Sequence, residues 1–123
     1  MNTESELVFV YGTLRRGASN HGHMDGSSHI SHANAKGHLY QVDWYPGLVI
    51  DPQGHEVAGE VYSVPSEMMD DLDQYEGPEY KRIKGTVTNC AGESLDVWIW
   101  EWKKPTDGLK KIPNGDWLLA ESC

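Results

Sequence analysis

Short apolar segments separated by turn-forming residues make up the first half of the chain. Residues 7–13 are apolar, β-branched or aromatic as far as Gly12, which predicts a buried strand. Three further strands are predicted at residues 36–44, 47–50 and 56–64. Residues 51–54 have the order of a type I turn, and Gly59 in the following strand is expected to mark a β-bulge.

The hydrophobic period changes from that of a strand to that of a helix after Pro65. Four apolar residues recur at helical spacing on one face: Met68, Met69, Leu72 and Tyr75. Pro65 is tolerated in a first helical turn, and Ser63 or Ser66 is expected to cap it. The Gly77-Pro78 pair ends the predicted helix.

A hairpin is predicted after the helix, from residues 80–89 and 94–102 around the turn at 90–93. In its second strand, Leu95, Val97 and Ile99 share one face and the tryptophans 98, 100 and 102 share the other. Because both faces are apolar, we expect this strand to be central in its sheet.

Residues 15–35 have almost no apolar periodicity and are rich in Gly, Ser, Asn and His, which predicts a long loop. Its histidines offer imidazole ligands for a transition metal: His21, His23, His29 and His32. A Gly- and Ser-rich loop is a poor preformed site, so we interpret these histidines as polar loop residues and assign no metal ligand. A metal- or partner-binding role for this loop is one alternative.

Several strands, one helix and a hairpin, in that order, predict an α+β fold with a small, mixed, barrel-like sheet and one main packed helix. The 123 residues are one domain's worth of sequence, and no repeat or linker divides them. We therefore expect a single domain over residues 1–123.

Composition and net charge restrict the classes of binding partner and the cellular compartment that we expect for this protein. Ten Lys and Arg against nineteen Asp and Glu give a net charge of −9, which argues against nucleic acid and anionic membranes. No run reaches the roughly 18 apolar residues of a membrane span. The first residues carry two acids and no basic segment before the apolar run, unlike a signal peptide. Two cysteines are too few for a disulfide framework, so we expect a soluble protein of the reducing cytoplasm.

Two local features have residues suited to catalysis or ligand binding, although each also has a purely structural interpretation. The segment Tyr11-Gly12-Thr13-Leu14 leads a strand into a turn whose backbone N–H groups can hold a carboxylate or an oxyanion. It can equally be an ordinary strand end. Glu76 stands at the C-terminus of the predicted helix, where the dipole and burial would raise its pKa. It can equally be a solvated residue of an acidic segment.

Five segments in this order resemble the γ-glutamylcyclotransferase-like family, and most closely its small bacterial members of the YtfP type. They are VFVYGTLRRG at 8–17, YPGLV at 45–49, GEVYSV at 59–64, LDQYEGPEYKR at 72–82 and DGLKKIPNGDW at 107–117. The resemblance covers nearly the whole chain. It implies a small β-barrel with a packed helix and a pocket at the barrel mouth. It also implies release of 5-oxoproline from γ-glutamyl compounds, without metal or cofactor.

The resemblance also assigns roles to particular residues. Glu76 matches the family's general base and acid, which takes a proton from the α-amine and returns it to the leaving amine. Gly12, Thr13 and Leu14 match the loop that holds the γ-glutamyl group.

At the border of that site, the resemblance implies that Tyr11 and Tyr80 wall the pocket. By its charge, Arg82 could pair with a substrate carboxylate or with Glu76, or it is a surface strand residue. Asn20 is interpreted as structural, and His21 could touch the substrate.

We therefore expect a γ-glutamylcyclotransferase that needs no cofactor and acts as a monomer on a small γ-glutamyl molecule. The alternative is a binding module that holds the same γ-glutamyl or amino-carboxylate group without turnover. The sequence does not choose the leaving amine, and it leaves open whether residues 15–35 form a lid.

Overall fold

The computed structural model describes residues 4–16, 18, 21–112, 115 and 117. Its strands are β1 (Ser5–Val10), β2 (Ser28–Gln41), β3 (Pro46–Ile50), β4 (His55–Pro65), β5 (Tyr80–Asn89), β6 (Ser94–Trp102) and β7 (Lys110–Lys111). The helical segments among these residues are α1 (Met69–Glu76) and two short 3₁₀ turns, η1 (His21–Met24) and η2 (Ser66–Met68).

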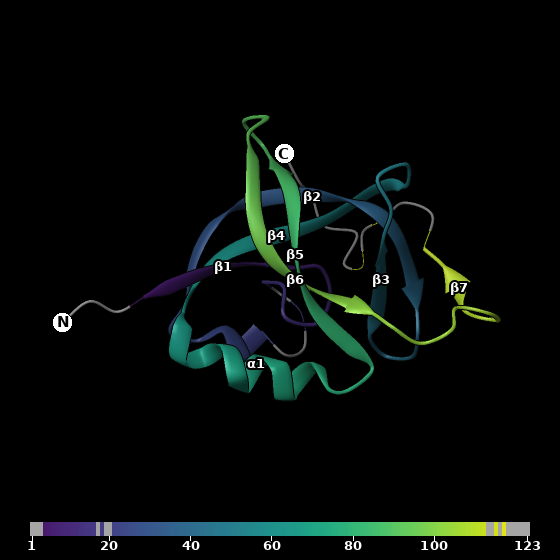
Figure 1. Ribbon diagram of the computed structural model, residues 1–123, viewed down its shortest axis with the longest axis horizontal. Helices are drawn as coiled ribbons and strands as arrows, with labels where there is room; N and C mark the ends of the chain where they lie inside the picture. The colour runs from purple at the N-terminus through teal and green to yellow at the C-terminus, as the bar shows by residue number, and fades with distance from the viewer. Residues whose placement is uncertain (1–3, 17, 19–20, 113–114, 116, 118–123) are drawn as a thin grey trace.

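Five strands close into a barrel in the order β2-β4-β1-β6-β5, because β5 pairs back onto β2 (Figure 1). The pair β1–β6 is parallel, with Val8 opposite Trp98, and the other barrel pairs are antiparallel. Strands β3 and β7 both pair with the C-terminal part of β2. This mixed barrel with one main helix confirms the predicted α+β architecture.

Alternating side chains of the strands fill the barrel interior. Its buried residues are Phe9, Tyr11, Ala33, Ala35, Leu39, Leu48, Val57, Val61, Val87, Val97 and Ile99. The hairpin of β5 and β6 has the predicted bounds, and β6 lies between β1 and β5. Val97 and Ile99 face the interior, whereas Trp100 on the opposite face packs in a second cluster. The prediction of a central strand is therefore confirmed.

Helix α1 covers the outer face of the barrel at the bottom of Figure 1. Met69 and Leu72 are its buried residues, and they pack against Val8, Val10 and Trp100. The helix ends at Gly77, whose φ of 83° lies in the region that glycine tolerates best. No side-chain hydrogen bond caps its N-terminus, so the cap expected from Ser63 or Ser66 is wrong.

The prediction of a loop over residues 15–35 is wrong in its second half. β2 begins at Ser28 and pairs with β4 from Ser28 to Gly37, with an irregularity between His29 and Ser31. This part of β2 is built from small and polar residues, so it lacks the apolar alternation by which strands are recognised. Its partner β4 supplies the apolar side chains at this point of the barrel.

Gly59 does not form the predicted bulge. It keeps its place in the ladder opposite Ala33. A Cβ atom at Gly59 would lie 2.4 Å from the Val10 carbonyl oxygen and 2.5 Å from the Phe9 ring, so the site requires glycine for close approach of neighbouring strands.

Two further observations concern membrane crossing and disulfide bonding. Within the described part of the chain, no helix is both long and apolar enough to cross a membrane. Cys90, in the turn between β5 and β6, is disulfide-bonded.

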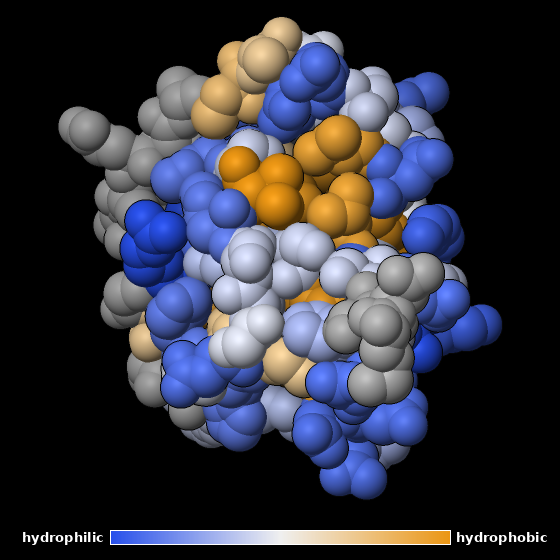
Figure 2. All heavy atoms as spheres, turned by 90° about the vertical axis from the view of Figure 1, so that its left-hand side faces the viewer, coloured by the Kyte–Doolittle hydropathy of each residue, from blue (hydrophilic) through white to orange (hydrophobic). Residues whose placement is uncertain are grey.

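Hydrophilic residues dominate the face of the molecule shown in Figure 2, around a central group of hydrophobic ones. Among the described residues, the exposed large hydrophobic side chains are Ile30, at 48% exposure, and Trp44, at 59%. Trp44 lies between β2 and β3, two residues before β3 begins, and it borders the cavity described next.

Candidate active site

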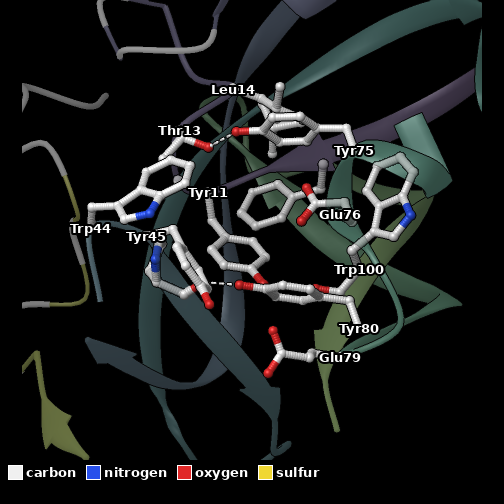
Figure 3. A pocket seen from close by; sticks show the side chains of 14 residues that line it. Tyr11, Thr13, Leu14, Trp44, Tyr45, Tyr75, Glu76, Glu79, Tyr80 and Trp100 are labelled. Atoms are coloured by element: carbon white, nitrogen blue, oxygen red, sulfur yellow. Dashed lines mark hydrogen bonds between the residues drawn. The ribbon is translucent and has the colours of Figure 1, made fainter. Parts of the chain in front are cut away.

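A cavity of about 210 Å³ lies where the end of β1, the start of β3, the end of α1 and the start of β5 meet (Figure 3). Fourteen residues line it: Phe9, Val10, Tyr11, Gly12, Thr13, Leu14, Trp44, Tyr45, Pro46, Tyr75, Glu76, Glu79, Tyr80 and Trp100. Six of the seven residues that the sequence proposed for the site are therefore brought together around one cavity. The seventh, Arg82, is not among them.

Tyr11 forms an inner wall of the cavity and is only 6% exposed. Its hydroxyl donates to the carbonyl oxygen of Trp100 at 2.7 Å and accepts the N–H of Leu48 at 3.2 Å. Burial, and then the nearby charge of Glu76, raises the pKa of Tyr11 well above its ordinary value. Tyr11 therefore stays neutral and ties β1 to β3 and β6.

The turn that follows β1 presents backbone to the cavity. The N–H of Arg15 donates to the Gly12 carbonyl at 3.1 Å, which closes the turn. Within the described part of the chain, no hydrogen bond from the N–H groups of Thr13 and Leu14 is found, so both can serve a ligand. A Cβ atom on Gly12 would lie 2.6 Å from the Pro46 ring, so only glycine fits here without displacing β3.

A buried ion pair holds this turn from outside the cavity. Arg15 Nε lies 3.2 Å from Glu60 Oε2, and both side chains are buried. The Arg16 N–H and the Tyr62 hydroxyl donate to Glu60 Oε1 at 2.9 and 2.8 Å. Burial alone would raise the pKa of Glu60, but these hydrogen bonds hold it below its ordinary value. The Glu60 carboxylate thereby holds Arg15 and the backbone of Arg16, which follow the turn.

Glu76 is the last residue of α1, and its carboxylate faces the cavity between the rings of Tyr75 and Tyr80 (Figure 3). Burial, followed by the charge of Asp73 one turn earlier, raises the pKa of Glu76 from 4.5 to about 8. Within the described residues no hydrogen bond to this carboxylate is found, so nothing offsets its desolvation. Near neutral pH the group can both accept and donate a proton.

Aromatic side chains surround Glu76. The Thr13 hydroxyl and the Tyr75 hydroxyl lie 2.5 Å apart, which joins the turn to α1. The Tyr80 hydroxyl donates to the Pro46 carbonyl at 2.5 Å, which joins β5 to β3. Burial, and then the charge of Glu76, raises the pKa of Tyr80, so its hydroxyl stays protonated.

Arg82 lies outside the cavity. Its Nε is 3.3 Å from Asp73 Oδ1, and its guanidinium stacks over the ring of Trp98 at 4.9 Å. The carboxylate that Arg82 pairs with is therefore Asp73, rather than Glu76. Tyr80 and Arg82 share one face of β5, but Arg82 stands two positions further along, beside α1.

The sequence did not single out the outer lining of the cavity. Trp44 and Tyr45 belong to the turn before β3, and Glu79 stands between α1 and β5. No spacing relates these segments in the sequence, because only barrel closure brings them together. The Tyr45-Pro46-Gly47 turn within the resembling segment 45–49 was the one available signal.

The histidines of residues 21–32 are divided between η1 and β2. His21 Nδ1 contacts the Leu14 carbonyl at 2.8 Å, and the ring of His23 packs on Tyr75 at 4.4 Å. Among the described residues there is no group of three or more His, Cys, Asp or Glu side chains that could hold a metal ion. Asn20 lies outside the described residues.

Comparisons with known proteins agree with this architecture. A family model described as "Gamma-glutamyl cyclotransferase, AIG2-like" matches residues 8–119. The chain is 35% identical over 121 residues to the gamma-glutamylcyclotransferase family protein YtfP of Escherichia coli K12, covering 90% of this chain and 95% of that protein. It is 34% identical over 120 residues to a gamma-L-glutamyl-butirosin B gamma-glutamyl cyclotransferase of Niallia circulans, covering 89% and 74% of the two chains.

A solved structure extends the likeness to the fold. The crystal structure of an AIG2-like protein from Mus musculus matches with a TM-score of 0.74 at 25% sequence identity, over 98% of this chain and 86% of that one. The likeness covers the barrel, α1 and the elements that line the cavity. The resemblance inferred from the sequence is therefore confirmed at the level of the family and the fold.

Proposed function

The chain belongs to the gamma-glutamyl cyclotransferase, AIG2-like family, and from this premise we propose that it catalyses the intramolecular aminolysis of a γ-glutamyl amide. The products are 5-oxoproline and a free amine. The observation that carries the proposal is the position of Glu76, a carboxyl group with a pKa raised to about 8 that faces the cavity lined also by the turn of Thr13 and Leu14.

The reaction needs one proton to move twice. The γ-glutamyl α-amine loses a proton to the carboxylate of Glu76, and its nitrogen forms a bond to the γ-carbonyl carbon. When the tetrahedral intermediate collapses, the bond between that carbon and the leaving nitrogen breaks. Glu76 returns the proton to the leaving amine. A pKa near working pH suits both steps, because a stronger acid would be a poor base and a weaker acid a poor donor.

The turn after β1 is suited to the negative charge that develops. In this proposal the N–H groups of Thr13 and Leu14 donate to the oxyanion of the tetrahedral intermediate or to the substrate carboxylate. The walls provided by Tyr11 and Tyr80 limit the space around the substrate, which favours the folded conformation that the five-membered ring requires. Because the nucleophile belongs to the substrate, no water or protein nucleophile takes part.

The test is 5-oxoproline release from a panel of γ-glutamyl compounds with peptide, amino-acid and amine leaving groups. We expect release by the wild-type protein and a loss of about 10²–10⁴-fold in Glu76→Gln, as for removal of a general base. Glu67→Gln, the same change at an exposed residue of η2, is the matched control and should retain activity. A folded wild-type protein that binds a panel member without releasing 5-oxoproline would instead be a binding module.

A further inference from the structure

A second, more open hollow lies beside the cavity. It is formed by the last turn of α1, by Tyr80 and the two residues that follow it on β5, and by Trp100 of β6. Tyr80 and Trp100 line both spaces, so these side chains belong to the wall between them. Glu76 faces the cavity, whereas Asp73, one helical turn earlier, lines the hollow. The two carboxyl groups therefore lie on two sides of one wall.

The Asp73 carboxylate is held from two strands. The Trp100 indole N–H donates to Asp73 Oδ1 at 2.8 Å, and Arg82 Nε lies 3.3 Å from the same oxygen. The backbone of Asp73 is fixed as well, because its carbonyl accepts the Gly77 N–H at 3.0 Å where α1 ends. Asp73 is therefore held close to the end of the helix that carries Glu76.

Packing as well as charge places Arg82. Its guanidinium lies 4.9 Å from the centre of the Trp98 ring. The side chains of Arg82 and Asp73 are 29% and 36% exposed, so solvent screens their ion pair only in part. Lys84 also lies over Trp98, at 4.4 Å, but none of the ion pairs found in the described part of the chain includes it. Of these two cations on one ring, Arg82 is the one that reaches α1.

The charge of Asp73 acts on Glu76 through the wall. Burial, and then this charge, raises the pKa of Glu76 from 4.5 to about 8. The other ionisable groups that line the cavity are also acids: Tyr11, Tyr45, Tyr75, Glu79 and Tyr80. The cations of the neighbouring hollow are Lys81 and Arg82, and Arg82 is the one paired with Asp73. Arg82 is therefore placed to oppose the charge that Asp73 exerts on Glu76.

We propose that Arg82 is a positioning residue for the acid–base step: it holds the Asp73 carboxylate and limits the repulsion between Asp73 and the ionised form of Glu76. The inference rests on the proposed function. Arg82 lies outside the cavity and acts through Asp73. Without the guanidinium, the full charge of Asp73 would favour the protonated form of Glu76. A smaller share of the enzyme would then hold the carboxylate that starts the reaction at neutral pH.

The test follows the ionisation of Glu76 both directly and through activity. Carbon-13 NMR of the glutamate side-chain carboxyl carbons reports each titration, and the signal missing from Glu76→Gln identifies that of Glu76. In Arg82→Gln the midpoint of Glu76 should rise by about half a pH unit, as for the loss of one partly exposed ion pair. The acid limb of kcat/KM for 5-oxoproline release should move with it. The plateau above that limb should stay near the wild-type value, because the cavity lining is unchanged.

Further variants assign the shift to the ion pair. Arg82→Lys keeps the positive charge and should restore most of the wild-type midpoint. In Asp73→Asn the midpoint should fall, and adding Arg82→Gln should then change it little, because the partner is gone. Lys84→Gln removes a positive charge from the same ring without touching the ion pair, and it should leave the midpoint and the basal rate as in the wild type. Arg82→Met, which keeps an alkyl stem over Trp98, replaces Arg82→Gln if that variant does not fold.

The outcomes separate the inference from the function on which it rests. An unmoved Glu76 midpoint in the folded Arg82 variant, or an equal shift in Lys84→Gln, overturns the role of Arg82 and leaves the cyclotransferase intact. A lower plateau with an unmoved acid limb means that Arg82 is only structural, and it also overturns the inference. No 5-oxoproline release by folded wild-type protein overturns the proposed function, and the NMR midpoints then show separately whether Arg82 acts on Glu76.

Discussion

Replacing Glu76 by glutamine removes a carboxyl group whose ionisation the fold opposes. Its pKa is raised from 4.5 to about 8, so between these values the folded protein holds a proton that the unfolded chain has lost. The unfolded state then binds fewer protons, and the free energy of unfolding falls as pH rises through this window. The stabilising effect of the raised pKa is complete below pH 4.5 and lost above about pH 8.

The size of the effect follows from about 1.4 kcal/mol per pKa unit. Relative to its value at low pH, the free energy of unfolding falls by about 1 kcal/mol at pH 5, about 3 at pH 7 and about 4 at pH 8. These are upper bounds, because Glu76 is only partly buried and solvent screens some of its charge. Glutamine cannot ionise, so Glu76→Gln should gain stability over the wild type by these amounts as pH rises.

Urea unfolding followed by tryptophan fluorescence at pH 5, 6, 7 and 8 measures this difference in the five-tryptophan chain. Other groups titrate equally in both proteins, so they cancel in the difference. The free energy of unfolding of Glu67→Gln should differ from that of the wild type by the same amount at every pH. A Glu76→Gln difference that is independent of pH, or that falls as pH rises, would refute the raised pKa and the role built on it.

Three further changes test the neighbours of Glu76. Asp73→Asn removes the second cause of the raised pKa, so the acid limb of the pH profile of kcat/KM should move to lower pH; an unmoved limb would count against this coupling. Tyr11→Phe leaves the Leu48 N–H and the Trp100 carbonyl without their partner, and urea unfolding should show a loss of about 1–3 kcal/mol. Glu60→Ala removes the carboxylate paired with buried Arg15 and should cost about 3–5 kcal/mol, with a raised KM because the turn after β1 loosens; a loss below about 1 kcal/mol would contradict this anchoring.

The sequence predicted the elements whose side-chain pattern is determined locally. The hairpin of β5 and β6 was predicted at its observed bounds, because strong alternation and a Gly-containing turn define it. Helix α1 was predicted from its apolar face, and only its capping differed. The N-terminal half of β2 was missed because small and polar residues form a strand there through pairing with β4.

The grouping of the proposed site residues around one cavity was predictable for a different reason. Tyr11, Gly12, Thr13, Leu14 and Glu76 lie within two motifs that the family resemblance picks out, and barrel closure brings those motifs to one cavity. Charge alone left open whether Arg82 pairs with a substrate carboxylate, pairs with Glu76 or lies on the surface, and in the structure it pairs with Asp73 of α1. Glu79 and Trp44 were recognised as cavity-lining residues only in the structure, because separate segments of the chain meet there.

The most direct test of the central claim is 5-oxoproline release by the wild type and by Glu76→Gln, measured with one γ-glutamyl amide from pH 5.5 to pH 9. The account predicts that wild-type kcat/KM rises with pH and levels off near the pKa of Glu76, at about 8. In Glu76→Gln, kcat/KM should be lower by orders of magnitude, and it should not show this rise with pH. Equal rates in the two proteins, both folded, would contradict Glu76 as the group that moves the proton.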